Sequence, residues 1–281
     1  MFLKVQKECI LFDFLFDKVG TASKTKISKM IKHGQILVNS VAQFKQDFLL
    51  KEGDLVEIRR NGVNKNISEL EVVYEDQDII VVEKPAGLLC ISTEGHDEET
   101  LFKMVSEHIK MENKKNRVFI VHRLDRDVSG LIIFAKSEKV KEALQKNWKN
   151  FEKRYVALVE GTPKEESGTI ETYLAENRAM VVYVCNSSDK NARKAVTKYS
   201  IIKKYGNYSL LSVKIDTGRK NQIRVHLAHI GHPIVGDKKY GASTNLIGRL
   251  ALHSIFLSIE HPVTKKQMIF EGKIPQLFLR G

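Results

Sequence analysis

From residue 118 onward the chain contains a series of closely spaced apolar segments, and their spacing constrains the fold more than any other feature. Each segment is rich in β-branched and aromatic residues and is bounded by polar turn residues, which is typical of β-strands. The segments are 118–121, 131–135, 154–161, 168–174, 179–185, 195–203 and 208–215. So many strands in succession predict a large, mostly antiparallel mixed sheet. Helical spacing occurs at 100–110 and after Ser137, so the predicted fold class is α+β, with helices and loops flanking the sheet.

The stretch from His122 to Leu131 is unusual for a connection between two strands. Its sequence is HRLDRDVSGL, with five charged or titratable side chains within nine residues. A plain turn needs only glycine, asparagine or aspartate, whereas loops between strands are also where functional residues gather. The residues alone leave two interpretations open. Either Asp125 or Asp127 caps a turn while the arginines face solvent, or the loop is a functional site.

The charge balance indicates a polyanionic partner. The formal net charge is +12, from 46 Lys and Arg against 34 Asp and Glu, and neutralising phosphates releases counterions that drive binding. The three cysteines (Cys9, Cys90 and Cys185) lie far apart, which indicates a reducing compartment rather than a disulfide framework or a zinc ribbon. No apolar run approaches the length of a membrane span, and the N-terminus does not resemble a signal peptide. We therefore expect a soluble, cytoplasmic, monomeric protein that binds nucleic acid.

Residues 23–34 predict a basic helix. Ser23 or Thr25 can cap it, the apolar positions recur at three and four residues, and Gly34 can end it. No acidic residue lies between Lys18 and Asp47, so the lysines of this helix lack the i, i+4 partners of a self-stabilised surface helix. An ordinary solvated face is the alternative, but the unpaired charge favours contact with phosphates. The predicted RNA-binding residues are Lys24, Lys26, Lys29 and Lys32.

Short matches to a known module run through the first part of the chain. They are Ser23-Lys24-Thr25-Lys26-Ile27, Met30-Ile31, Gly34, Val38-Asn39 and Glu52-Gly53-Asp54. Together they resemble the small, helix-rich RNA-binding domain named after ribosomal protein S-four, although Gln35 and Ser40 depart from its pattern. We expect that domain at 1–60, a polar linker at 61–68 and a second domain at 69–281.

A second set of motifs covers nearly all of the second domain. These motifs are Lys84-Pro85-Ala86-Gly87, His122-Arg123-Leu124-Asp125 with Ser129-Gly130-Leu131, Lys153-Arg154-Tyr155, the segment from Gly218 to His226, Gly236-Asp237 with Tyr240-Gly241, and the segment from Arg249 to His253. They resemble the RluA-type pseudouridine synthases. Two positions depart from that family: Val128 stands where threonine is usual, and Asn221 where histidine is usual.

The resemblance implies a role for each of several residues. Asp125 would be the essential catalytic residue, Tyr155 would stack on the target base, and Arg224 would pair with Asp125 as a bidentate partner. It also suggests RNA contacts at Lys84, Arg123, Arg126 and Arg219. No cofactor or metal is implied. His226, His229 and His232 could suggest a metal site, but Gly231-His232-Pro233 breaks the helix before a third ligand can join.

The expected function is therefore conversion of specific uridines in structured RNA to pseudouridine, without a cofactor. By analogy with the family, large-subunit ribosomal RNA is the favoured substrate and transfer RNA the alternative. Because of Val128 and Asn221, a non-catalytic RNA-binding or ribosome-assembly factor remains a second hypothesis. A hydrolase that releases free uracil is a third.

Overall fold

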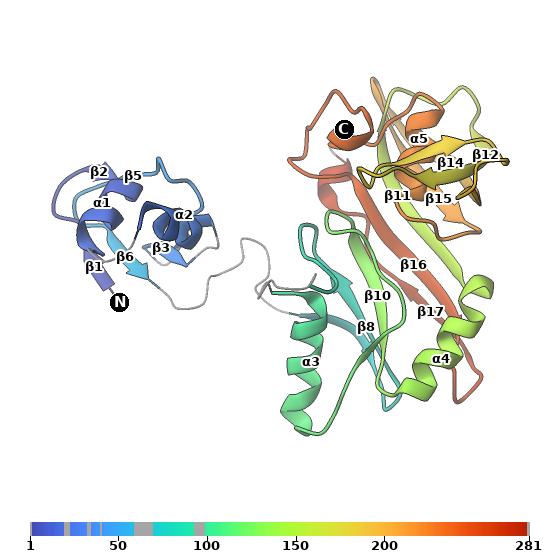
Figure 1. The fold of residues 1–281 in the computed structure, drawn as a ribbon, viewed down its shortest axis with the longest axis horizontal. Helices are drawn as coiled ribbons and strands as arrows, with labels where there is room; N and C mark the ends of the chain where they lie inside the picture. Colours follow the sequence, from blue (N-terminus) through green and yellow to red (C-terminus); the bar gives the residue numbers. More distant parts are fainter. Residues whose placement is uncertain are drawn as a thin grey trace. The chain divides into compact units, whose positions relative to one another are not determined.

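The structure is a computed structural model that describes residues 2–19, 23–32, 35–39, 41–58, 70–92 and 99–279. The chain divides into two compact units, Met1–Glu69 and Leu70–Gly281, each with its own core (Figure 1). Each unit is described by itself below. Within the described ranges, no helix is long and apolar enough to cross a membrane.

The described residues of the first unit form two helices and six short strands. The helices are α1 (Leu11–Lys18) and α2 (Lys24–Lys32), and the strands are β1 (Phe2–Lys4), β2 (Cys9–Ile10), β3 (Ile36–Val38), β4 (Val41–Ala42), β5 (Leu49–Leu50) and β6 (Leu55–Ile58). Four strands form a sheet in the order β1-β6-β3-β4, and β2 pairs with β5. Helices and strands thus contribute about equally, and the assignment to the S-four-like domain stays a prediction.

Helix α2 forms where the sequence predicts it. Ser23 Oγ accepts a hydrogen bond from the Lys26 amide at 3.3 Å, which satisfies one of the free N–H groups of the first turn. Ile27 and Ile31, four residues apart, are fully buried in the core of the unit. Lys24, Lys26 and Lys29 are exposed. The predicted end at Gly34 and the side chain of Lys32 lie outside the described part.

The second unit is built on one large sheet. Its described residues form eleven strands, nine of them in the order β13-β12-β14-β15-β11-β16-β10-β8-β7, with β17 added to β16 and β9 to β10. The strands are β7 (Glu71–Glu75), β8 (Ile79–Lys84), β9 (Phe119–Ile120), β10 (Ser129–Ala135), β11 (Glu152–Glu160), β12 (Ser167–Glu176), β13 (Val182–Cys185), β14 (Arg193–Tyr205), β15 (Tyr208–Ile215), β16 (Leu252–Glu260) and β17 (Gln267–Glu271). Among these pairs only β10 and β16 run parallel, so the predicted mostly antiparallel mixed sheet is confirmed.

One predicted strand begins later than expected. Strand β13 starts at Val182, not at residue 179. The Asn177 side chain accepts a hydrogen bond from the Val181 amide at 2.9 Å, and Met180 has a φ of 59°. This turn chemistry overrides the apolar character of the segment, because a residue with positive φ cannot continue a strand.

The helices of the second unit lie against the sheet. Helix α4 (Glu138–Asn147) contacts β9 and β10, and α5 (Gln222–His229) contacts β13 and β14 (Figure 1). Helix α3 (Leu101–Glu112) reaches β7 through His108, whose Nε2 lies 2.7 Å from Glu75 Oε2. Thr100 and Ser137 cap α3 and α4 by accepting the Lys103 and Val140 amides. Three short 3-10 helices complete the unit: η1 (Trp148–Asn150), η2 (Lys238–Tyr240) and η3 (Gln276–Leu279).

The parallel contact between β10 and β16 lies directly after the His122–Asp127 stretch. Ser129 is in register with His253, and Gly130 with Ser254. Gly130 has a φ of +112°, and a Cβ at this position would lie 2.2 Å from the Ser254 carbonyl oxygen. Only glycine combines that backbone conformation with so close an approach. This junction sets where the preceding loop leaves the sheet.

Candidate active site

The loop of residues 121–128, called the Asp125 loop below, is anchored by its apolar residues. Leu124 and Val128 are buried on either side of Asp125. The Cys90 thiol donates to the Leu124 carbonyl at 3.2 Å and accepts the Leu124 amide at 3.4 Å. The Val128 amide closes the turn on the Asp125 carbonyl at 3.2 Å. The Asp125 carboxylate is thereby held out of the core, with 36% of its side chain exposed.

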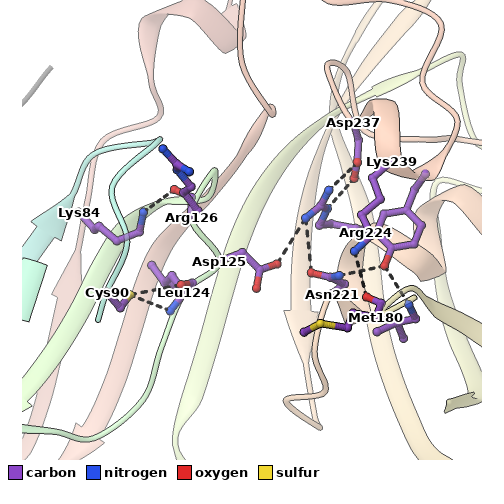
Figure 2. Close-up of polar contacts among 12 residues, drawn as sticks. Lys84, Cys90, Leu124, Asp125, Arg126, Met180, Asn221, Arg224, Asp237 and Lys239 are labelled. Carbon is purple, nitrogen blue, oxygen red and sulfur yellow. Dashed lines mark hydrogen bonds and ion pairs between the residues drawn. The ribbon is translucent and has the colours of Figure 1, made fainter. Parts of the chain in front are cut away.

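Lys84 also holds this loop, and its predicted contact with RNA stays a prediction. Its side chain is fully buried. Its Nζ donates to the carbonyls of Pro85 and Leu88 at 2.9 and 2.8 Å. It also donates to the Arg126 carbonyl at 2.9 Å (Figure 2). Burial lowers the pKa of the Lys84 ammonium to about 8. An ammonium has only three donors, and these carbonyls occupy all of them. Because Arg126 belongs to the Asp125 loop, Lys84 ties that loop to the 85–88 turn.

A cavity of about 580 Å³ opens beside Asp125. Its walls come from segments that are far apart in sequence: 89–91, the Asp125 loop, the region from Trp148 to Tyr155, and residues 215–224. All three predicted catalytic residues, Asp125, Tyr155 and Arg224, line it. The structure therefore brings together the residues that the motifs single out separately.

Arg224 lies between two carboxylates. It is in the first turn of α5, with 11% of its side chain exposed. Its Nε and Nη2 donate to the two carboxylate oxygens of Asp237, each at 2.7 Å, while Nη1 lies 3.6 Å from Asp125 Oδ2 (Figure 2). Burial works to lower the pKa of Arg224, but Asp237 and then Asp125 outweigh it and the pKa is raised. The expected bidentate pairing with Asp125 is wrong: the bidentate partner is Asp237.

Asn221 and Tyr240 complete the surroundings of Arg224. Asn221 precedes α5 with a φ of 53°, a left-handed conformation that asparagine adopts more readily than most residues. Its Nδ2 donates to the Tyr240 hydroxyl at 2.9 Å, and its Oδ1 lies 3.4 Å from Arg224 Nη1. The Arg224 guanidinium lies over the Tyr240 ring at 5.1 Å. Asn221 thus links Tyr240 to Arg224.

Gln222 holds the segment before α5 in place. It is 3% exposed. Its Oε1 accepts the Thr217 hydroxyl at 2.7 Å and the Arg219 amide at 3.1 Å, and its Nε2 donates to the Val196 carbonyl and the Thr197 hydroxyl, both at 2.9 Å. One buried amide therefore fastens the 217–222 segment to β14.

Tyr155 supplies an aromatic wall. It lies on β11, in register with Val213 and Ser254 of the neighbouring strands, and is 9% exposed. Burial, followed by the nearby charge of Asp125, raises the pKa of its phenol to about 12. The phenol is therefore neutral at ordinary pH. Stacking of its ring on a base stays a prediction.

A second wall, which the sequence did not reveal, consists of His122, Trp148 and Lys153. The His122 ring stacks on Trp148 with centroids 4.3 Å apart, and its Nε2 accepts the Ile133 amide at 3.2 Å. Burial, with a smaller effect of Lys153, lowers the pKa of His122 to about 3. Lys153 Nζ donates to the Trp148 carbonyl at 2.7 Å. His122 is thus a neutral stacking residue. In the sequence, only its place beside Arg123 in the motif could have indicated that it belongs to the site.

Six of the other predicted RNA-binding residues are exposed. Arg123, Arg126 and Arg219 line the cavity next to Asp125. Arg126 Nε donates to the Gly87 carbonyl and Arg219 Nε to the Lys194 carbonyl, both at 3.1 Å. Lys24, Lys26 and Lys29 belong to the first unit. The roles of all six in RNA binding stay predictions.

Two of the histidines considered for a metal site have other partners, and one of them is His232, whose Nδ1 lies 2.9 Å from the Glu160 carbonyl oxygen. His226 is fully buried, and its two ring nitrogens lie 2.9 Å from the hydroxyls of Thr172 and Thr197. Among the described residues, Asp76, Asp78 and His261 have potential ligand atoms within 4.8 Å of one another. Asp76 already accepts the amides of residues 78 and 79 and contacts His261 at 3.1 Å. These contacts indicate that the cluster stabilises a turn.

Comparison with known proteins points to one family. A family model described as RNA pseudouridylate synthase matches residues 78–229. An uncharacterised RNA pseudouridine synthase of Bacillus subtilis is 31% identical, over 96% of this chain and 92% of that protein. An uncharacterised RNA pseudouridine synthase of Aquifex aeolicus is 34% identical, over 91% and 87%. Ribosomal large subunit pseudouridine synthase D of Pseudomonas aeruginosa is 32% identical, over 92% and 86%.

Solved structures agree on the fold. The structure of human RNA pseudouridylate synthase domain containing 4 superposes with a TM-score of 0.62 at 22% identity, and covers 74% of this chain and 90% of that one. The human domain containing 1 protein gives a TM-score of 0.60 at 23% identity, with 75% and 86% covered.

Proposed function

Because the chain belongs to the RNA pseudouridylate synthase family, we propose that Asp125 is the residue with which it converts uridine in RNA to pseudouridine. The observation that carries this proposal is the meeting of Asp125, Tyr155 and Arg224 at one cavity. They come from a loop, a strand and a helix, and 99 residues separate the first from the last. Such convergence supports a common site, because distant polar residues rarely share a concave surface without a function.

The reaction is an isomerisation. The bond between the sugar C1′ and the uracil N1 breaks, the base turns within the site, and C1′ joins the uracil C5. The hydrogen on C5 is released as a proton, and N1 gains one. Asp125 would act in its ionised form, which the Arg224 charge at 3.6 Å favours. The base must leave its stack to reach the cavity, and the neutral ring of Tyr155 offers it a flat apolar surface.

The test is Asp125→Asn with RNA that carries tritium at C5 of its uridines. We expect the variant to fold and bind RNA but to release no tritium, because an amide cannot replace the carboxylate. Asp127→Asn, a change in the same loop, is the matched control and should keep most of the activity. Full release by Asp125→Asn would overturn the proposal. Free uracil among the products would indicate the hydrolase instead.

We further propose large-subunit ribosomal RNA as the substrate. The support is the 32% identity to the Pseudomonas aeruginosa enzyme, whose name states that substrate. Mapping pseudouridines in RNA from cells with and without the gene is the test. A site missing from large-subunit RNA supports the proposal, and one missing from transfer RNA would reassign the substrate. If no site is missing, the hypothesis of a non-catalytic RNA-binding factor is favoured.

A further inference from the structure

The guanidinium of Arg224 uses its two edges differently. The edge formed by Nε and Nη2 is fully engaged with Asp237, at 2.7 Å for both contacts. Nη1 faces Asn221 and Asp125, at 3.4 and 3.6 Å. The side chain of Asp237 is 1% exposed and that of Asp125 is 36% exposed. The buried carboxylate therefore has the close contacts, and the accessible one has only a longer ionic contact (Figure 2).

From this asymmetry we propose that Asp237 is a positioning residue, which holds Arg224 by one edge and so leaves the Asp125 carboxylate charged but free to react. The inference rests on the proposed role of Asp125. It assigns Asp237 no contact with RNA, since Asp237 is buried behind Arg224 and does not line the cavity.

The physical reason lies in the geometry of the two groups. A guanidinium and a carboxylate prefer a closed pair with two parallel hydrogen bonds. If Arg224 closed in that way on Asp125, both carboxylate oxygens would be occupied as acceptors and less available for chemistry. In this structure Arg224 forms that closed pair with Asp237, in the interior, instead. At 3.6 Å, Nη1 still favours the charged form of Asp125 but lies beyond normal hydrogen-bond length.

Neighbouring groups keep Arg224 in this orientation. The Tyr240 ring lies beside the guanidinium at 5.1 Å, and the Tyr240 hydroxyl accepts from Asn221 Nδ2. The Asp237 amide donates to the Ile234 carbonyl at 2.9 Å, and the Tyr240 amide donates to the Asp237 carbonyl at 3.1 Å. The backbone that carries Asp237 is thus held on both sides, so its carboxylate is a fixed reference for Arg224.

The first experiment is Asp237→Asn in the full chain, assayed by single-turnover tritium release at saturating enzyme. The rate should fall about tenfold, as expected for groups coupled within one network. The dissociation constant for RNA should stay within about twofold, because Asp237 does not face the cavity. Glu166→Gln removes a carboxylate from the exposed ion pair with Lys204 and should leave the rate unchanged. An unchanged rate in Asp237→Asn would overturn the inference.

The second measurement is the pH dependence of the same rate. Without Asp237, Arg224 is free to close on Asp125 as a bidentate partner, which changes the contacts of both groups at the cavity. The pH profile of the rate should therefore change its shape in Asp237→Asn. A purely structural role for Asp237 would lower the rate by the same factor at every pH, and that result would count against the inference.

The third measurement tests whether Asp237 acts through Arg224. In an Arg224→Lys background the planar fork is gone, so adding Asp237→Asn should change the rate by less than about twofold. A full, multiplicative loss in the double variant would overturn the inference. The pair of variants in this background decides the question even if Asp237→Asn alone does not fold. If Asp125→Asn is inactive while Asp237→Asn is normal, the proposed function survives and only this inference fails.

Discussion

At the residue scale, the buried cations of the second unit have their roles set by their partners. Lys84 and Arg224 belong to motifs that suggest contact with RNA or with Asp125, yet the close contacts of Lys84 are with carbonyls and those of Arg224 with Asp237. A buried charge must be paired or hydrogen-bonded to be tolerated. The partner that satisfies it therefore decides which way the side chain points.

Replacing Lys84 with methionine should destabilise the second unit. The change leaves the carbonyls of Pro85, Leu88 and Arg126 without their common donor. We expect a loss of about 3 kcal/mol in the free energy of unfolding, because unsatisfied buried acceptors are costly. Urea unfolding measures it, and Lys110→Met, an exposed position on α3, should change it by less than about 0.5 kcal/mol. Equal losses in the free energy of unfolding for the two variants would contradict the interpretation that Lys84 links these carbonyls in the interior.

His226 should make stability depend on pH. Burial, and then His229, lowers its pKa to about 4 in the folded protein, whereas an unfolded histidine has a pKa of about 6.5. The unfolded chain therefore binds the proton first, so this contribution is present above about pH 6.5 and is lost as the pH falls towards 4.

The test compares the free energy of unfolding of the wild type and His226→Gln at pH 7 and pH 5. The variant should lose less stability over this interval, by about 1 to 2 kcal/mol. His229→Gln, on the exposed side of the same helix, should keep most of the wild-type dependence. An identical pH dependence in wild type and His226→Gln would show that His226 is not held neutral.

At the scale of elements, the junction of β10 and β16 positions the Asp125 loop. The motif residues Ser129 and Gly130 are also the first residues of β10, so the loop is fixed where the strand begins. Ser129 Oγ accepts from Arg249 Nη1 and contacts His253 Nδ1, both at 2.9 Å. Two motif segments that look separate in the sequence thus meet in one hydrogen-bonded junction.

Gly130→Ala should disrupt this junction. Its Cβ would lie 2.2 Å from a backbone oxygen and the φ of +112° is strained for alanine, so we expect a loss of more than about 3 kcal/mol, beyond ordinary overpacking. Gly206→Ala is the control, because Gly206 has a φ of +54° and open space around it. That change should cost about 1 kcal/mol. Thermal unfolding of both variants measures the difference, and similar melting temperatures would contradict the close approach.

The sequence pattern predicts most elements of the second unit. The large sheet follows from alternation and turn residues, and the helices expected at 100–110 and after Ser137 are confirmed. It fails at residues 179–181, where Asn177 forms a turn with its own neighbours. The local hydrogen bonds determine the structure there, because the strand propensity of three apolar residues without a paired strand cannot offset the stability of a well-formed turn.

At the scale of the whole molecule, the excess of positive charge should govern affinity for RNA. Lys24, Lys26 and Lys29 are exposed on α2. Changing all three to glutamine should weaken RNA binding and reduce the slope of log affinity against log salt by about 2 to 3, close to one for each phosphate that is no longer neutralised. Filter binding at several salt concentrations is the measurement. Lys110→Gln, Lys114→Gln and Lys115→Gln form a control of equal charge, and an equal change in slope would indicate non-specific attraction.

The linear sequence is enough to predict the mixed sheet and to identify the motif segments, because strand periodicity and local motifs are properties of neighbouring residues. The resemblance of those motifs to a known family indicated the family. Only the tertiary structure decides the pairing of Arg224 with Asp237, the burial of Lys84 and the wall made by His122, Trp148 and Lys153. Several of these contacts join groups that are distant in the chain, such as Lys84 with Arg126 and His122 with Trp148. The strength of an ionic or polar contact depends on distance and burial, and folding alone sets both.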